Sequence, residues 1–151
     1  MRSTDPGSTS KPAGSRPVAA DLVTVDSRSC SPFSTVLEAA LVFRDEDCGT
    51  LPVLDAGKLL GVVTDRDIAL GVPEYPDLAA RPVSDVMSRA VAEIRPDEPL
   101  DAIEARFARE RVRDLVVIDS AGRLVGVIAW CDLIKHLQDG RLSGVIAPSA
   151  D

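Results

Sequence analysis

A run of four residues, Thr64, Asp65, Arg66 and Asp67, lies where a short apolar segment ends and a predicted helix begins. At such a helix start, the side chains of Thr64 and Asp67 can form a capping box by accepting hydrogen bonds from free backbone N–H groups. The same groups can bind a nucleotide, because a hydroxyl and helix N–H donors suit a phosphate and a carboxylate accepts from ribose hydroxyls. The residue chemistry alone leaves both interpretations open.

Two further residues, Arg113 and Asp132, are candidates for sites of the same kind. A guanidinium can bind a phosphate through two parallel hydrogen bonds, although most exposed arginines are only solvated. Asp132 takes the place of Asp67 in a second copy of the pattern, but Ala129 stands where a hydroxyl is expected and Trp130 follows it. The Trp130 ring either stacks on an adenine or fills space by packing. The two helix starts therefore offer a ligand different polar groups.

Catalysis finds little support in the sequence, and we predict that the protein is not an enzyme. It contains no Ser-His-Asp set, no metal-ligand spacing and no glycine-rich phosphate loop. A helix N-terminus favours ionised carboxylates, which makes Asp65 and Asp67 poor general acids. The single histidine, His136, is expected on the exposed face of a helix.

The composition favours an acidic cytoplasmic protein with an aliphatic core. Its 151 residues are 45% hydrophobic but only 3% aromatic, and the net charge of −7 argues against binding nucleic acid. No apolar run reaches the ~18 residues of a membrane span. Residues 1–16 carry no secretory signal, and their Ser, Pro and Gly content predicts a disordered tail. The three cysteines form neither a disulfide framework nor a zinc pattern.

The chain contains an internal duplication. Residues 51–55 match 115–119 at an offset of 64, and residues 59–63 match 124–128 at an offset of 65. The predicted boundaries are a tail (1–16), repeat 1 (17–71), a linker (72–81), repeat 2 (82–138) and a C-terminal tail (139–151). Because the period is longer than that of solenoid proteins, we expect the two copies to form one pseudo-symmetric unit.

The residue pattern of each copy predicts the order strand, helix, strand, strand, helix. The matched segments 51–55, 59–63, 115–119 and 124–128 are apolar, rich in β-branched residues and bounded by turns, which predicts buried strands. Apolar residues at helical spacing predict helices at 36–43 and 100–107, and second helices are expected at 66–70 and 132–137. The first strands are predicted at Asp21–Val25 and Val91–Ile94, with an uncertain register in repeat 1.

These segments resemble the CBS domain, a repeat first described in cystathionine β-synthase. Gly61–Asp67 is similar to its Gly-φ-φ-Thr/Ser-x-x-Asp motif, in which φ is apolar, Gly49–Val53 to the start of its central hairpin, and Val83–Met87 to the lead-in of a second repeat. The resemblance implies an α/β (α+β) fold in which two β-α-β-β-α repeats pack about a pseudo-twofold axis as a Bateman module. It also implies two clefts that often bind AMP, ADP, ATP or S-adenosylmethionine, and frequent homodimers.

In the family, each cleft combines the Thr-x-x-Asp segment of one repeat with the hairpin start of the other. The first cleft would bring residues 111–114 towards Thr64 and Asp67, and the second would bring Asp132 towards residues 49–50 and Cys48 towards Cys131. Asp114 departs from the family pattern and leaves the ligand preference open. We expect the two clefts to be unequal, with the one at Thr64 and Asp67 functional. The resemblance favours a regulatory module that senses an adenosine-containing nucleotide, requires no cofactor and acts on an unknown protein. The alternative is a structural or protein-interaction dimerisation module with empty clefts.

Overall fold

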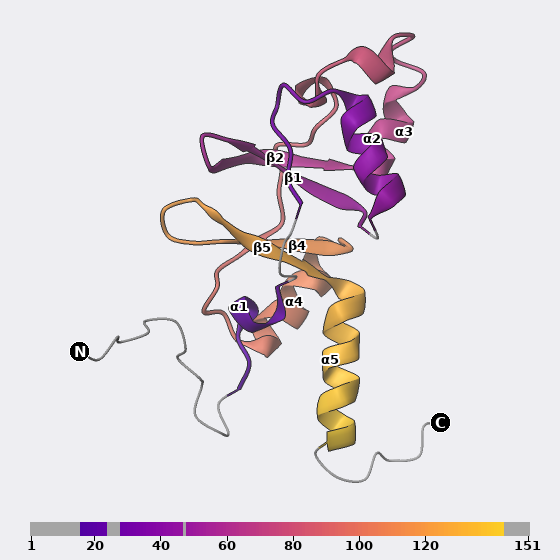
Figure 1. The fold of residues 1–151 in the computed structure, drawn as a ribbon. Helices are drawn as coiled ribbons and strands as arrows, with labels where there is room; N and C mark the ends of the chain where they lie inside the picture. Colours follow the sequence, from indigo (N-terminus) through magenta and orange to yellow (C-terminus); the bar gives the residue numbers. More distant parts are fainter. Residues whose placement is uncertain (1–15, 24–27, 47, 144–151) are drawn as a thin grey trace, which may run out of the picture.

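The computed structural model describes residues 16–23, 28–46 and 48–143, so all of the predicted N-terminal tail except Arg16 lies outside the described residues. Two similar α/β halves are stacked on each other (Figure 1). The first half contains α2 (Val36–Asp45), β1 (Thr50–Asp55), β2 (Lys58–Thr64) and α3 (Asp65–Gly71). The second half contains β3 (Glu93–Ile94), α4 (Leu100–Glu110), β4 (Asp114–Ile118), β5 (Leu124–Ala129) and α5 (Trp130–Ser143). This is the mixed α/β architecture that the duplication predicts.

The central hairpins of the two repeats are built alike, as predicted. β1 pairs with β2 in antiparallel fashion and β4 with β5, and each pairing has a register shift at the same place, after Val53 and after Val117. Both turns contain a glycine with positive φ, Gly57 at 80° and Gly122 at 79°, a conformation that side-chain-bearing residues adopt at a cost. Matching turns and registers therefore follow from the matching sequences.

The predicted first strand of repeat 1 is wrong for the part of Asp21–Val25 that is described. Ala19–Leu22 forms the short helix α1, because the Asp21 carboxylate accepts a hydrogen bond from the Val18 N–H at 2.8 Å. The strand position is taken instead by Cys30, which pairs in parallel with Val53. In repeat 2 the prediction at 91–94 overlaps β3, which pairs in parallel with β4.

Each repeat completes the hydrophobic core of the other. Ala19 lies fully buried among the core residues of repeat 2, and α1 lies beside β5 although it comes first in the sequence (Figure 1). Val83, 64 residues later in the short helix η2 (Val83–Asp85), is buried in the core of repeat 1. The segments that lead into the two repeats, which contain Ala19 and Val83, are thus exchanged. The sequence repeats are therefore not independent folding units.

This exchange explains the glycine that opens the motif in each repeat. A Cβ atom on Gly61 would overlap the carbonyl oxygen of Ser88, and a Cβ on Gly126 would lie 2.8 Å from the Cβ of Val23. Ser88 and Val23 follow the exchanged lead-in segments and are themselves 65 residues apart. The glycines therefore provide room for the crossing chain.

A small apolar cluster of Val62, Val116 and Ile118 joins the two hairpins. The backbones of Lys58 and Arg123 form an isolated antiparallel β-bridge between the same hairpins.

Helix α5 continues to Ser143, beyond residue 138, at which we placed the end of repeat 2. Within the described residues, none of the helices combines the length and apolar character needed to span a membrane.

Candidate ligand-binding site between the repeats

The start of α3 has the predicted capping box. The Thr64 hydroxyl accepts a hydrogen bond from the Asp67 N–H at 3.1 Å, and the Asp67 carboxylate accepts one from the Thr64 N–H at 2.9 Å. Both side chains are half-buried, Thr64 at the end of β2 and Asp67 in the first turn of α3. The hydroxyl keeps its own proton to donate, and one carboxylate oxygen of Asp67 is not used by the cap. The cap therefore holds both groups in place without using all their hydrogen-bonding capacity.

Arg113 reaches the start of α3 from the other repeat, but its partner is Asp65. Its Nη2 donates to Asp65 Oδ1 at 2.7 Å, and its guanidinium lies against Gly49, where a Cβ would be only 3.1 Å from Nη2. This hydrogen bond lowers the pKa of Asp65 and raises that of Arg113. The predicted approach of the 111–114 segment to α3 is therefore seen at Asp65.

A second contact across the repeats joins Thr50 to Asp114, whose carboxylate accepts a hydrogen bond from the Thr50 hydroxyl at 2.7 Å. Burial raises the pKa of Asp114, and the nearby carboxylates of Asp132 and Asp65 raise it further, whereas Thr50 and Arg113 lower it. We did not predict this hydrogen bond. The offset of 64 residues was the available signal, because equivalent positions beside a twofold axis must face each other.

The remaining candidates contribute less. Arg66 is exposed, and among the described contacts its backbone N–H donates to Asp65. Asp132 is half-buried and acts electrostatically on Asp114, which in turn is bonded to Thr50. Asp132 thus lies near the elements predicted for the second cleft, but no direct bond from it to Thr50 is seen among the described contacts.

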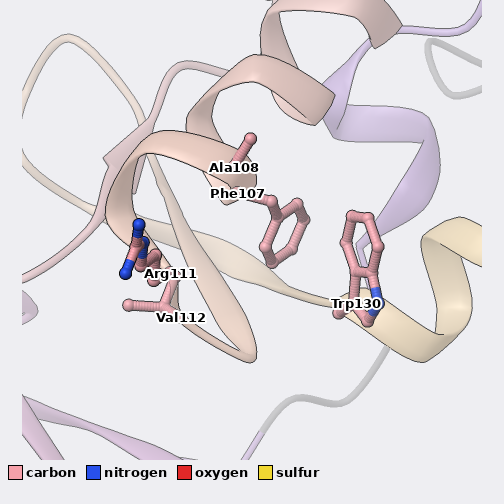
Figure 2. A pocket seen from close by; sticks show the side chains of 5 residues that line it. All are labelled: Phe107, Ala108, Arg111, Val112 and Trp130. Atoms are coloured by element: carbon pink, nitrogen blue, oxygen red, sulfur yellow. The ribbon is translucent and has the colours of Figure 1, made fainter.

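Trp130 packs edge-on against Phe107, with ring centroids 5.3 Å apart and an angle of 64° between the planes. The two rings lie at one side of a hollow of about 220 Å³, to which Ala108, Arg111 and Val112 also contribute (Figure 2). All five residues belong to repeat 2. The packing role that we weighed for Trp130 is therefore present, while stacking on an adenine stays a prediction.

The cysteines and the histidine differ in their exposure. Burial, with a smaller effect from Glu38, raises the pKa of the Cys30 thiol to about 11, which makes it a poor nucleophile. Cys48 is half-buried and packs against the core of repeat 1, whereas Cys131 is exposed. The proposed approach of Cys48 to Cys131 stays a prediction. His136 is exposed on α5, as predicted, and no group of three or more His, Cys, Asp or Glu within the described residues is arranged to hold a metal ion.

Comparison with known proteins identifies this arrangement. A sequence model of the CBS domain matches residues 18–74 and again residues 83–139, which together make up most of the chain. The chain belongs to the CBS domain family. Its two halves are therefore two CBS domains, which form a pair.

The CBS domain-containing protein YhcV of Bacillus subtilis is 32% identical over 124 residues, which cover 82% of this chain and 88% of YhcV. Several curated enzymes also match, but the chain covers only 14–23% of their length, so the likeness extends to their CBS regions and not to the whole enzymes.

Two solved structures have the same fold. The CBS domain pair of protein MJ0100, in complex with 5′-methylthioadenosine and S-adenosyl-L-methionine, superposes with a TM-score of 0.72 at 24% identity, covering 84% of this chain and 99% of that one. CBSX2 in complex with AMP superposes with a TM-score of 0.70 at 21% identity, covering 82% of this chain and 97% of that one.

Proposed function

We propose that this CBS pair binds an adenosine-containing ligand between its two repeats and passes the signal to a protein partner. The observation that carries the proposal is the Asp65–Arg113 contact, which joins the polar start of α3 to the hairpin start of repeat 2. This junction brings a cation, a hydroxyl and carboxylates together between the two repeats, so a ligand bound there can alter how the repeats pack against each other. Two proteins of the same fold carry adenosine compounds in their structures.

The side chains at this junction match the parts of a nucleotide. Arg113 uses one N–H on Asp65, and the other donors of its guanidinium can bind an anion such as phosphate. The Thr64 hydroxyl can donate its proton, and the free oxygen of Asp67 can accept from a ribose hydroxyl. AMP, ADP, ATP and S-adenosylmethionine are the candidate ligands, and no cofactor is required.

We propose that the site at Thr64 and Asp67 is stronger than the equivalent site at Asp132. Ala129 offers no hydroxyl there, and Trp130 takes the place of Asp65 and packs on Phe107. A hydrogen bond to a charged group contributes about 1.5–3 kcal/mol, so its loss lowers affinity tenfold or more. One ligand per chain is therefore expected.

Titration calorimetry against AMP, ADP, ATP and S-adenosylmethionine tests the proposal. Asp67→Asn keeps the size of the side chain and should remove most of the binding, whereas Asp132→Asn, its match in repeat 2, should affect binding much less. A ligand at 100 times its Kd should also stabilise the fold by ~2.7 kcal/mol in a thermal shift assay. Two equivalent sites per chain, or a larger loss with Asp132→Asn, would contradict the assignment.

A structural or protein-interaction module is the second candidate, and the hydrogen bonding favours it in one respect. Thr64 and Asp67 cap α3, and Arg113 is bonded to Asp65, so each of these four side chains has a partner within the chain. If no adenosine compound binds at concentrations up to a few millimolar, this second function is the better account.

We further propose that the protein forms a homodimer through the helices of repeat 1. Leu37 and Leu41, one turn apart on α2, are 51% and 39% exposed, and Leu70 on the adjoining α3 is 59% exposed. In repeat 2 the equivalent positions are Asp101, Ala105 and Lys135. On α5, by contrast, Leu133 is fully buried and Leu137 packs against the core of its own repeat.

An apolar face confined to one repeat suits a twofold interface, in which the same surface of each copy meets the other. Leu41→Glu should shift the protein to the monomer in light scattering, whereas Ala105→Glu, at the equivalent exposed position of repeat 2, should not. A wild-type mass of 16.0 kDa at micromolar concentration would rule out the dimer.

A further inference from the structure

The guanidinium that the proposed ligand would use is already engaged by the chain. Arg113 extends over Gly49 to Asp65 from the bend just before β4, and its own carbonyl accepts a hydrogen bond from the Trp130 N–H at 2.8 Å. Asp65 is fixed on the opposite side as the first residue of α3. The two residues of the pair are therefore anchored in different repeats, Arg113 next to β4 and Asp65 at the start of α3.

We infer that Asp65 competes with the anionic group of the ligand for Arg113, and so sets how strongly the site favours anionic over uncharged adenosine compounds. This inference rests on the proposed function and adds a residue that determines ligand preference. An anion that binds Arg113 must displace the carboxylate of Asp65 or share the guanidinium with it.

Electrostatics and exposure set the size of this competition. The hydrogen bond from Arg113 lowers the pKa of Asp65, so the carboxylate is ionised and the pair stays formed near neutral pH. The side chain of Arg113 is 65% exposed and that of Asp65 is 54% exposed, which places the pair among weak surface ion pairs. The apparent affinity for an anion falls in proportion to the fraction of molecules in which Arg113 is free. An uncharged nucleoside does not require that release.

The competition has a structural consequence. Among the described contacts, Thr50–Asp114 is a second side-chain hydrogen bond between the repeats near this point, and Arg113 is not one of its two partners, although Arg113 lowers the pKa of Asp114 electrostatically. An anionic ligand that displaces Asp65 would therefore remove one polar link between the repeats and leave the Thr50–Asp114 link in place. An uncharged ligand would leave both links intact, so the two ligand classes would produce different states of the pair.

The test compares AMP with adenosine by titration calorimetry on the full chain. Asp65→Asn should raise the affinity for AMP about two- to fivefold, the range that an exposed ion pair allows, and change that for adenosine by less than about twofold. Asp77→Asn is the matched control, because it removes the same charge and breaks the exposed Asp77–Arg81 pair. Neither affinity should change in this control.

A double variant separates competition for Arg113 from a general effect of charge. If Asp65 acts through Arg113, Asp65→Asn should have no effect on AMP affinity in an Arg113→Gln background. An increase that persists there, or an unchanged ratio of AMP to adenosine affinity in Asp65→Asn alone, would overturn the inference while the proposed function stands. Failure of the wild type and of Asp65→Asn to bind AMP, adenosine, ADP, ATP or S-adenosylmethionine would overturn both.

Discussion

The two repeats share a backbone arrangement but differ at the start of their second helix. In repeat 1, α3 begins with a capping box and a carboxylate that bonds to the other repeat. In repeat 2, α5 begins with a tryptophan that packs on Phe107 of its own repeat. Duplication thus preserves the hairpins and the crossing glycines, while the positions that face the other repeat are free to acquire different chemistry.

The shared arrangement can be broken at its glycines, where we expect the largest effect. Gly61→Ala should destabilise the fold by about 1–3 kcal/mol or more, because the new methyl group overlaps the Ser88 backbone. Gly126→Ala meets the side chain of Val23, which can move, so its cost should be smaller. Urea denaturation of both variants measures the difference. Equal stability of Gly61→Ala and the wild type would show that the lead-in segment does not cross there.

The difference between the helix starts can be tested by exchanging the cap. Thr64→Ala should cost ~1 kcal/mol of stability, because a backbone N–H of α3 loses its acceptor. Ala129→Thr should stabilise α5 by about 0.5–1 kcal/mol, because Asp132 lies three residues later and completes a capping box. Thermal unfolding at neutral pH measures both. If Ala129→Thr destabilises the protein, the packing of Trp130 has no room for a cap.

The smallest expected effect concerns the hydrogen bond between the repeats that joins Thr50 of repeat 1 to Asp114 of repeat 2. Because burial raises the pKa of Asp114, its ionised form opposes folding at neutral pH, and this penalty disappears as the pH falls towards the ordinary value of 3.8. Asp114→Asn should therefore stabilise the protein slightly at pH 7 and have less effect near pH 4.

Asp65 is the control for that pH dependence, because its pKa is shifted in the opposite direction from that of Asp114. Its pKa is lowered, so its pair with Arg113 stabilises the fold above the ordinary value of 3.8 and this contribution is lost as the pH falls further. Asp65→Asn should lose less than about 1 kcal/mol at pH 7, as is typical of exposed pairs. Unfolding free energies measured from pH 3 to pH 7 should show the two variants diverging from the wild type in opposite directions.

Much of the fold could be predicted because its signals are local. Alternating turns and β-branched runs fixed both hairpins, and apolar residues at helical spacing fixed α2 and α4. The capping box at Thr64 and Asp67 was also predictable, since it joins residues three apart. The prediction of the first strand was wrong because local composition misled it. The segment at Asp21 has a strand-like composition, but the Asp21 side chain caps a short helix that docks on the other repeat.

By itself, the sequence determined that this protein is a duplicated α/β pair with a hydroxyl and a carboxylate at one helix start and an alanine and a tryptophan at the other. Only the tertiary structure decided that Arg113 bonds to Asp65, that Thr50 faces Asp114, and that each lead-in segment completes the opposite core. Those contacts join residues 48 and 64 positions apart. Their geometry depends on how two folded bodies pack, which local propensities do not encode.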